Sequence, residues 1–174
     1  MKNSGIVRKV DELGRIVIPK EIRKTLGIRT GSSVEISVLE EGKLILQKFS
    51  DVGNIEEIAK DCLESIFSAF QTPLILTDGE TVVSCVGLNK KEFLGRKISE
   101  EYCCEKEKNF QDCLLVEGQC NRFEKVIKFP VSSSGFYCGD LFLCKKPDGV
   151  DISEDVVAVC RVMAEYITRI LNFE

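Results

Sequence analysis

The sequence predicts an α+β protein with two domains, a small one over residues 1–50 and a larger one over residues 55–174, joined by a linker at 51–54. Three observations lead to this prediction. Residues 1–49 carry ten Lys or Arg against six Asp or Glu, a net charge of +4, and the remainder carries −8 within a total of −4. Residues 1–50 contain short runs rich in Val and Ile, which are typical of strands. Residues 55–174 begin and end with apolar residues at helical spacing. We therefore expect a basic module attached to an acidic one.

The first elements are a hairpin and a short helix. Gly5–Val10 and Arg15–Ile18 have the composition of strands, and Asp11–Gly14 between them has that of a turn. Pro19 fits the first turn of the helix that follows, and Gly27 fits its C-terminal cap. The helix is therefore expected to be about two turns long.

Ser33–Leu39 and Lys43–Lys48 alternate apolar and polar residues around a Glu-Glu-Gly turn, which predicts a second hairpin. Such short elements bury little surface, because even a domain of about 60 residues hides only about 60% of its unfolded surface. We therefore expect a second copy of the chain to share the core. In a two-fold dimer the basic residues of one face form a doubled cationic patch that fits double-stranded DNA. These residues are Arg8, Lys9, Arg15, Arg23 and Lys24.

The stretch GIVRKVDELGRIVIPKEIRKTLGI, residues 5–28, resembles the N-terminal domain of the AbrB family of transition-state regulators. Chains of that family form an intertwined dimer that binds DNA. The resemblance implies an N-terminal swapped-hairpin β-barrel here, with Arg8, Arg15, Arg23 and Lys24 on the DNA. The family often has arginine where Lys24 stands, and lysine keeps the charge but loses the planar bidentate fork.

The second domain is predicted to contain a sheet enclosed by two amphipathic helices. The apolar stripe of the first helix is Ile55, Ile58, Ala59, Cys62, Leu63, Ile66, Phe67 and Phe70. Strands are expected at Pro73–Thr77, Thr81–Val86, Val126–Val131 and Phe136–Cys144. The last helix begins at residues 151–155, and its stripe is Val156, Val159, Cys160, Met163, Ile167, Ile170 and Leu171.

The stretch FPVSSSGFYCGDLFL, residues 129–143, resembles a GAF domain, a fold that often holds a pocket for a small molecule or cofactor. The resemblance implies an α/β/α domain. With LNKKEFLGRKIS at residues 88–99, the chain resembles the SpoVT-like branch of the AbrB family, regulators in endospore-forming bacteria. This implies a homotetramer, dimerised for DNA at the N-terminal domains and assembled partly through the terminal helices of the GAF-like domains. Residues 101–124 match least.

The predicted function is a cytoplasmic, DNA-binding transcriptional regulator of sporulation or transition-state genes, either activator or repressor. No apolar run approaches the roughly 20 residues of a membrane span. Without histidine no Ser-His or Cys-His pair exists, so no enzyme and no catalytic residue is predicted. Whether the GAF-like domain binds an effector, and through which residues, is left open by the sequence. The alternatives are a module that binds a partner protein and an antitoxin. Antitoxins with this N-terminal fold usually end in an extended tail, whereas residues 55–174 have the pattern of a folded domain.

The chain has nine cysteines, an odd number that excludes complete pairing within one chain and fits a reducing compartment. Five are expected to be small buried hydrophobes: Cys62, Cys85, Cys138, Cys144 and Cys160. Four are clustered and could hold zinc or an iron-sulfur cluster: Cys103, Cys104, Cys113 and Cys120. Because their spacing contains no C-x-x-C pair, a redox-sensing thiol switch and ordinary reduced thiols remain alternatives.

Overall fold

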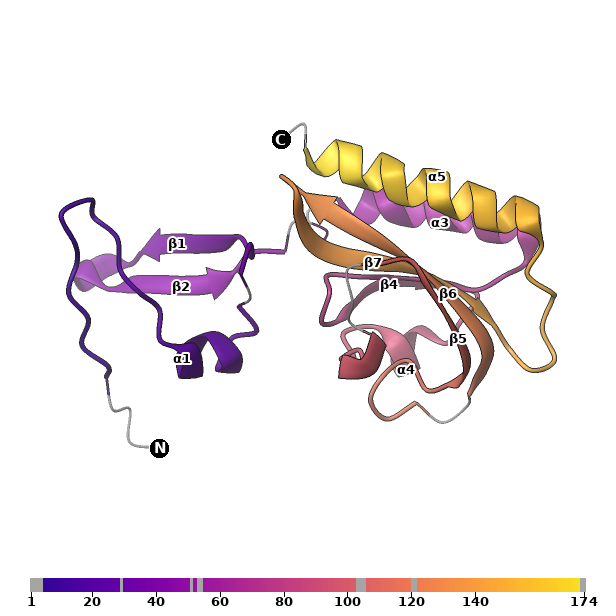
Figure 1. Ribbon diagram of the computed structural model, residues 1–174, viewed down its shortest axis with the longest axis horizontal. Coiled ribbons are helices and arrows are strands. Elements are labelled where there is room, and N and C mark those ends of the chain that lie inside the picture. The colour runs from indigo at the N-terminus through magenta and orange to yellow at the C-terminus, as the bar shows by residue number, and fades with distance from the viewer. Residues whose placement is uncertain are drawn as a thin grey trace. The chain divides into compact units, whose positions relative to one another are not determined.

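A computed structural model describes residues 5–28, 30–50, 52, 55–102, 106–119 and 122–172. The chain divides into two compact units, residues 1–48 and residues 49–174 (Figure 1). Among the described residues, no helix is both long and apolar enough to cross a membrane.

The first unit contains the predicted helix and the predicted second hairpin. Helix α1 spans Lys20–Thr25, with Pro19 at the residue before it rather than within its first turn. The helix ends where Gly27 takes a φ of 65° and the N–H of Ile28 donates to the carbonyl of Arg23 at 2.8 Å. Glycine suits this left-handed position because it has no Cβ to clash with the backbone.

Strands β1 (Val34–Val38) and β2 (Leu44–Lys48) pair antiparallel around a 3₁₀ turn at Glu40–Gly42, as predicted. The first hairpin differs from its prediction, because neither Gly5–Val10 nor Arg15–Ile18 is a strand in the single chain. A strand needs a neighbouring backbone to pair with its N–H and C=O groups. Among the described residues, no ladder joins the two segments to each other or to another strand.

The second unit is built on an antiparallel sheet of five strands in the order β4-β3-β7-β6-β5. Their bounds are β3 Leu74–Thr77, β4 Val82–Val86, β5 Lys108–Cys113, β6 Phe123–Ser133 and β7 Phe136–Lys145. A Cβ at Gly139 would lie 2.1 Å from the carbonyl oxygen of Thr77, so only glycine allows β7 to approach β3 this closely. The four predicted strands are confirmed, and β5 was not predicted.

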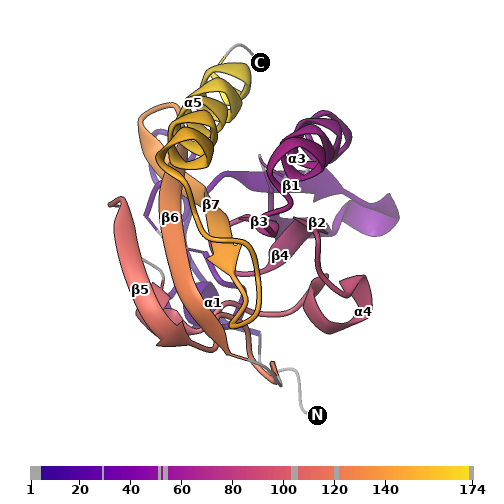
Figure 2. The same cartoon turned by 90° about the vertical axis from the view of Figure 1, so that its right-hand side faces the viewer.

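Both long helices, α3 (Glu56–Phe70) and α5 (Glu154–Leu171), cover one face of the sheet (Figures 1 and 2). Ser153 caps α5 by accepting a hydrogen bond from the N–H of Val156 at 3.4 Å. Between helices and sheet lies a core that includes Leu63, Ile66, Leu76, Phe129, Leu141, Cys160 and Ile167. Two residues expected on the buried stripes, Ile58 and Val159, are exposed instead.

The other face of the sheet is covered by the short helix α4 (Lys90–Phe93), a 3₁₀ turn at Glu100–Tyr102 and loops. Its core includes Phe93, Tyr102, Cys113, Leu115, Phe123 and Phe142. Two opposite charges are buried in this face, where the Nζ of Lys128 lies 2.9 Å from Oδ1 of Asp140. Tyr137 also donates its hydroxyl to Asp140, so the carboxylate is held by two side chains.

Candidate nucleic-acid interface

Four of the five basic residues predicted to meet DNA are exposed in the first unit. Arg8, Lys9 and Arg15 lie on the segments on either side of the Asp11–Gly14 turn, and Lys24 lies on α1. Their charged groups can therefore reach a polyanion without a change in the fold of the unit.

The turn is closed by Asp11, a residue that the sequence analysis counted only as a turn former. Its Oδ1 accepts hydrogen bonds from the N–H of Leu13 at 3.0 Å and of Arg15 at 2.8 Å. Its Oδ2 accepts from the Nε of Arg15 at 2.8 Å. The backbone N–H of Arg15, followed by its guanidinium, lowers the pKa of Asp11, so the carboxylate stays charged at neutral pH. Arg15 is thus held at its Nε while its side chain remains 70% exposed.

A sequence signal for this arrangement exists, because Asp at the start of a tight turn commonly accepts from the backbone two residues on. Gly14 completes the turn with a φ of 77° and an N–H that donates to the carbonyl of Asp11 at 3.0 Å. The turn formed by Asp11 and Gly14 therefore reverses the chain and also places Arg15 beside the carboxylate of Asp11.

On α1, Arg23 differs from the other basic residues because it is half-buried. Its Nε is buried and has no hydrogen-bond partner among the residues that the structure describes. A buried guanidinium nitrogen without a partner is unfavourable in a single chain. Lys24, one residue further on, is exposed in the last turn of α1, where a cation is favourable.

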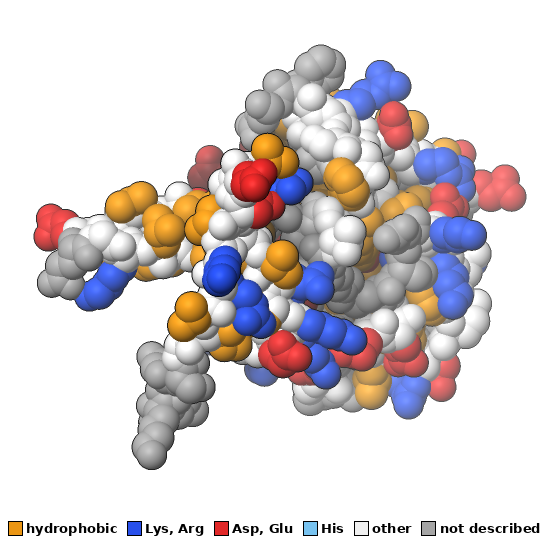
Figure 3. All heavy atoms as spheres, turned by 60° about the vertical axis from the view of Figure 1, so that its left-hand side comes forward, with side chains coloured by type: hydrophobic (Ala, Val, Ile, Leu, Met, Phe, Trp, Pro, Cys, Tyr) orange, Lys and Arg blue, Asp and Glu red, His pale blue; other side chains and the backbone are white. Residues whose placement is uncertain are grey.

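The first unit has almost no core of its own. Within residues 5–48, only Pro19 and Ile28 are buried among the described side chains. Ile36 and Val38 of β1 face Leu46 and Leu44 of β2 across the ladder, and Ile36 is 62% exposed. Hydrophobic and basic side chains are interspersed on the face of the molecule shown in Figure 3. Exposed apolar patches mark sites of contact with another protein, a membrane or a ligand.

Three of the four predicted metal ligands, Cys103, Cys104 and Cys120, lie outside the described residues. Cys113 is described, and it lies buried in β5. Among the described residues, no group of three or more acidic or cysteine side chains could hold a metal ion. The metal site therefore stays a prediction.

Five cysteines were expected to be buried. Cys85, Cys144 and Cys160 are buried, whereas Cys62 and Cys138 are half-buried. Burial raises the pKa of the thiol of Cys160 to about 12 and also raises the pKa of the thiols of Cys85 and Cys144. Because the thiolate is the reactive form, burial lowers the reactivity of these thiols, in accord with their position in the core.

Two families match the chain. Residues 7–51 match the family described as antidote-toxin recognition MazE, bacterial antitoxin. Residues 54–172 match the family described as stage V sporulation protein T C-terminal, transcription factor. The two matches together cover most of both units.

Among curated relatives, stage V sporulation protein T of Bacillus subtilis is 40% identical over 100 residues, which are 58% of this chain and 56% of the relative. The transition state regulatory protein AbrB of the same organism is 61% identical over 49 residues, 28% of this chain and 50% of that protein. The chain thus spans about half the length of the curated relatives it matches.

Two solved structures share the fold of the second unit. The GAF domain of an Acinetobacter phosphoenolpyruvate-protein phosphotransferase gives a TM-score of 0.53 at 12% identity, over 67% of this chain and 81% of that chain. A GAF domain/HD domain protein from Geobacter sulfurreducens gives 0.51 at 14% identity, over 70% of this chain and 94% of that chain. At such low identity these structures establish a GAF fold and nothing about ligands.

Proposed function

Because the chain belongs to the stage V sporulation protein T C-terminal family, we propose that it is a transcriptional regulator that binds double-stranded DNA through its first unit. The observation that carries the proposal is the set of exposed basic residues in a unit that is 61% identical to AbrB over 49 residues. Sporulation or transition-state genes are the proposed targets, since both relatives carry these processes in their names.

The first unit is proposed to act as an intertwined homodimer. Its apolar hairpin face is open and its N-terminal segments have no ladder in the single chain, so a second copy would supply both a core and strand partners. Strand pairing with a partner would also extend the segments that carry Arg8, Lys9 and Arg15. The partner would in addition bring a second set of these residues to the DNA.

The second unit is proposed to join two such dimers into a tetramer. On α5, Val159, Val162 and Tyr166 are exposed, although α5 packs its other side against the sheet. Apolar residues left on the outer side of a terminal helix can pack against another copy. The GAF-like domain would thereby place two DNA-binding dimers in one assembly.

DNA recognition is proposed to rest largely on phosphate contacts and on the shape of the double helix. Arg8, Lys9, Arg15, Arg23 and Lys24 are all cationic, and cations that meet phosphates position a protein without reading bases. If four of these residues in each chain of a dimer met phosphates, about eight contacts would form. The affinity would then depend strongly on salt concentration.

An antitoxin is the second candidate, favoured by the MazE match over residues 7–51. The remainder of the chain supports a regulator instead, because it carries its own two-sided core and matches a transcription-factor family.

Ile36→Asp in the full chain tests the dimer on which this function depends. The carboxylate would be buried in the apolar face shared with Leu44 and Leu46, so we expect a smaller assembly in sedimentation velocity. Duplex affinity, measured by fluorescence anisotropy, is expected to fall about 100-fold or more, because burying an unpaired charge costs several kcal/mol.

Ser37→Asn is the matched control, since it adds no charge to the first unit and residue 37 points to the opposite side of the same strand from Ile36. It should leave both the mass and the affinity close to those of the wild type. An Ile36→Asp protein with wild-type mass and wild-type affinity would refute the dimer.

A further inference from the structure

The turn between Asp11 and Arg15 holds a side chain as well as the backbone. The N–H of Asp11 donates to the carbonyl of Arg15 at 3.0 Å, and the N–H of Gly14 donates to the carbonyl of Asp11 at 3.0 Å. The carboxylate of Asp11 accepts three further hydrogen bonds, two from backbone N–H groups and one from the Nε of Arg15. All of these bonds join residues within the stretch 11–15, so the turn does not depend on the partner that is proposed to cover the rest of the unit.

The carboxylate of Asp11 is itself fixed by the backbone. Its Oδ1 accepts from the N–H of Leu13 at 3.0 Å and of Arg15 at 2.8 Å, which leaves Oδ2 to accept from the Nε of Arg15 at 2.8 Å. An ordinary surface ion pair contributes little, because two long side chains must both be ordered to form it. Here the turn has already ordered one of the two partners, so only the side chain of Arg15 loses freedom.

The hydrogen bond at Nε restricts the orientation of the whole guanidinium of Arg15. This group is planar and carries five N–H donors, one on Nε and four on the two terminal nitrogens. A guanidinium held at Nε therefore keeps its four terminal donors in one plane beside the turn. The side chain of Arg15 is 70% exposed, so a ligand can reach these donors while Asp11 keeps its hydrogen bond.

A phosphate group of DNA matches this presentation. Two terminal nitrogens of one arginine can donate to two oxygens of one phosphate in a bidentate contact. Ordering a long, free side chain during binding would cost part of the affinity, and Asp11 provides the order before binding. A carboxylate near DNA also repels phosphates, which weakens binding. The two effects of Asp11 on DNA affinity thus have opposite signs, and a measurement can separate them.

We propose that Asp11 is a positioning residue for DNA binding, an acidic side chain that strengthens the contact between Arg15 and a phosphate by holding the Nε of Arg15. This role rests on the proposed binding of double-stranded DNA by the first unit. It assigns a favourable effect on the affinity for a polyanion to a carboxylate that does not itself bind the DNA.

Asp11→Asn in the full chain tests this role. The Oδ1 of an asparagine can still accept from the N–H groups of Leu13 and Arg15, but its amide nitrogen donates and cannot accept from Nε. The affinity for duplex DNA, measured by fluorescence anisotropy, is expected to fall about 5- to 20-fold, because the cost of ordering Arg15 returns in both chains of the dimer. Repulsion by the carboxylate alone predicts tighter binding instead, so an unchanged or higher affinity would overturn the proposal.

Glu12→Gln is the matched control, since it removes a carboxylate from the next position of the same turn. Glu12 is exposed, and the carboxylate that pairs with Arg15 is that of Asp11. The control should leave the affinity unchanged or raise it by up to about twofold, because it removes only a screened repulsion. A fall in affinity as large as that of Asp11→Asn would contradict a specific role of Asp11.

Two further measurements separate positioning from a general effect on the turn. In an Arg15→Ala chain, Asp11→Asn should change the affinity by less than about twofold, because no Nε remains to be held. A second loss as large as the first would contradict the proposal. Without DNA, the Nε–H proton of Arg15, assigned in NMR spectra by its loss in Arg15→Ala, should exchange with water faster in Asp11→Asn than in the wild type, and equal exchange rates would also contradict it.

The same experiments distinguish this role from the function on which it rests. A wild-type chain that does not bind duplex DNA would refute the proposed function. Wild-type binding that Asp11→Asn does not weaken would refute the role of Asp11 alone.

Discussion

Asp140→Ala is expected to lower the free energy of unfolding of the second unit by about 3–5 kcal/mol, because it leaves the ammonium of Lys128 buried without its counter-charge. The pair lies between β6 and β7, and each side chain is almost entirely removed from water. The hydroxyl of Tyr137 would also lose the carboxylate to which it donates. Chemical denaturation of the full chain, followed by circular dichroism, measures the change.

The matched control is Asp148→Ala, which removes an exposed carboxylate from a loop of the same unit and should change stability by less than about 0.5 kcal/mol. The double variant Lys128→Met, Asp140→Leu should recover most of the loss, since replacing both buried charges with apolar groups is often neutral or stabilising. An unfolding midpoint of Asp140→Ala equal to that of the wild type would show that this ion pair is not buried in solution.

Arg15→Ala is expected to weaken binding to duplex DNA about 10- to 100-fold. In the proposed dimer the substitution removes two charged contacts, each worth about 1.5 kcal/mol or less after discounting for the exposure of the side chain. The slope of log K against log salt concentration should become less steep by about 1.8, since each phosphate contact contributes about 0.9. Fluorescence anisotropy over a range of salt concentrations gives both quantities.

Arg96→Ala is the control for Arg15→Ala, because it removes an exposed arginine from the second unit. It should change neither the affinity nor the slope. If Arg15→Ala behaves like Arg96→Ala, the segment around the Asp11 turn does not contact DNA.

The elements with strong local patterns could be predicted from the sequence. Helix α5 begins after a capping serine and keeps Val156, Cys160 and Ile167 on its buried side, as the spacing required. Strands β6 and β7 are long runs rich in apolar residues on either side of a Ser-Gly turn, and their pairing follows from proximity in the chain.

Other elements depended on contacts that no local pattern records. β5 is a mostly polar strand whose apolar residues, Phe110 and Cys113, are too few to show an alternation, and it forms because β6 offers a free edge. Strand character at Gly5–Val10 was visible in the sequence, yet a single chain provides no partner there. In the proposed dimer, the pairing partner of that segment would lie on another copy of the chain.

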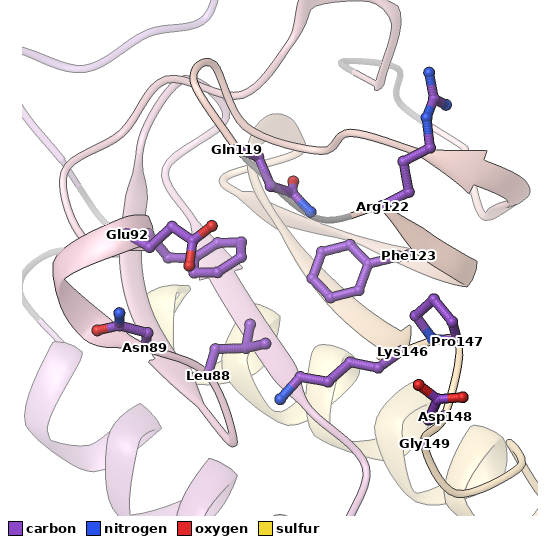
Figure 4. A pocket seen from close by; sticks show the side chains of 11 residues that line it. Leu88, Asn89, Glu92, Gln119, Arg122, Phe123, Lys146, Pro147, Asp148 and Gly149 are labelled. Carbon is purple, nitrogen blue, oxygen red and sulfur yellow. The ribbon is translucent and has the colours of Figure 1, made fainter.

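The candidate sites were predictable to different degrees. The basic residues could be selected by charge and by resemblance. The turn pattern at Asp11 predicts its backbone hydrogen bonds but not the hydrogen bond from the Nε of Arg15, which depends on a side-chain conformation. The cavity of the second unit lined by Leu88, Phe123 and Pro147 (Figure 4) could not be predicted from the sequence, because its lining comes from three segments that are far apart in the chain. The Cys113 thiol is buried in the core that also contains Tyr102 and Phe123. Its grouping with Cys103, Cys104 and Cys120 stays a prediction, because those three residues lie outside the described part of the chain.

The salt dependence of binding between the unmodified chain and duplex DNA tests the central claim most directly. A dimer that makes about eight phosphate contacts should give a slope of log K against log salt concentration near −7. If the wild-type chain shows a salt dependence of this size and Ile36→Asp loses DNA binding, the first unit is the part that binds DNA. An affinity that is absent at low salt, or that does not change with salt, would contradict a regulator that binds DNA through these basic residues.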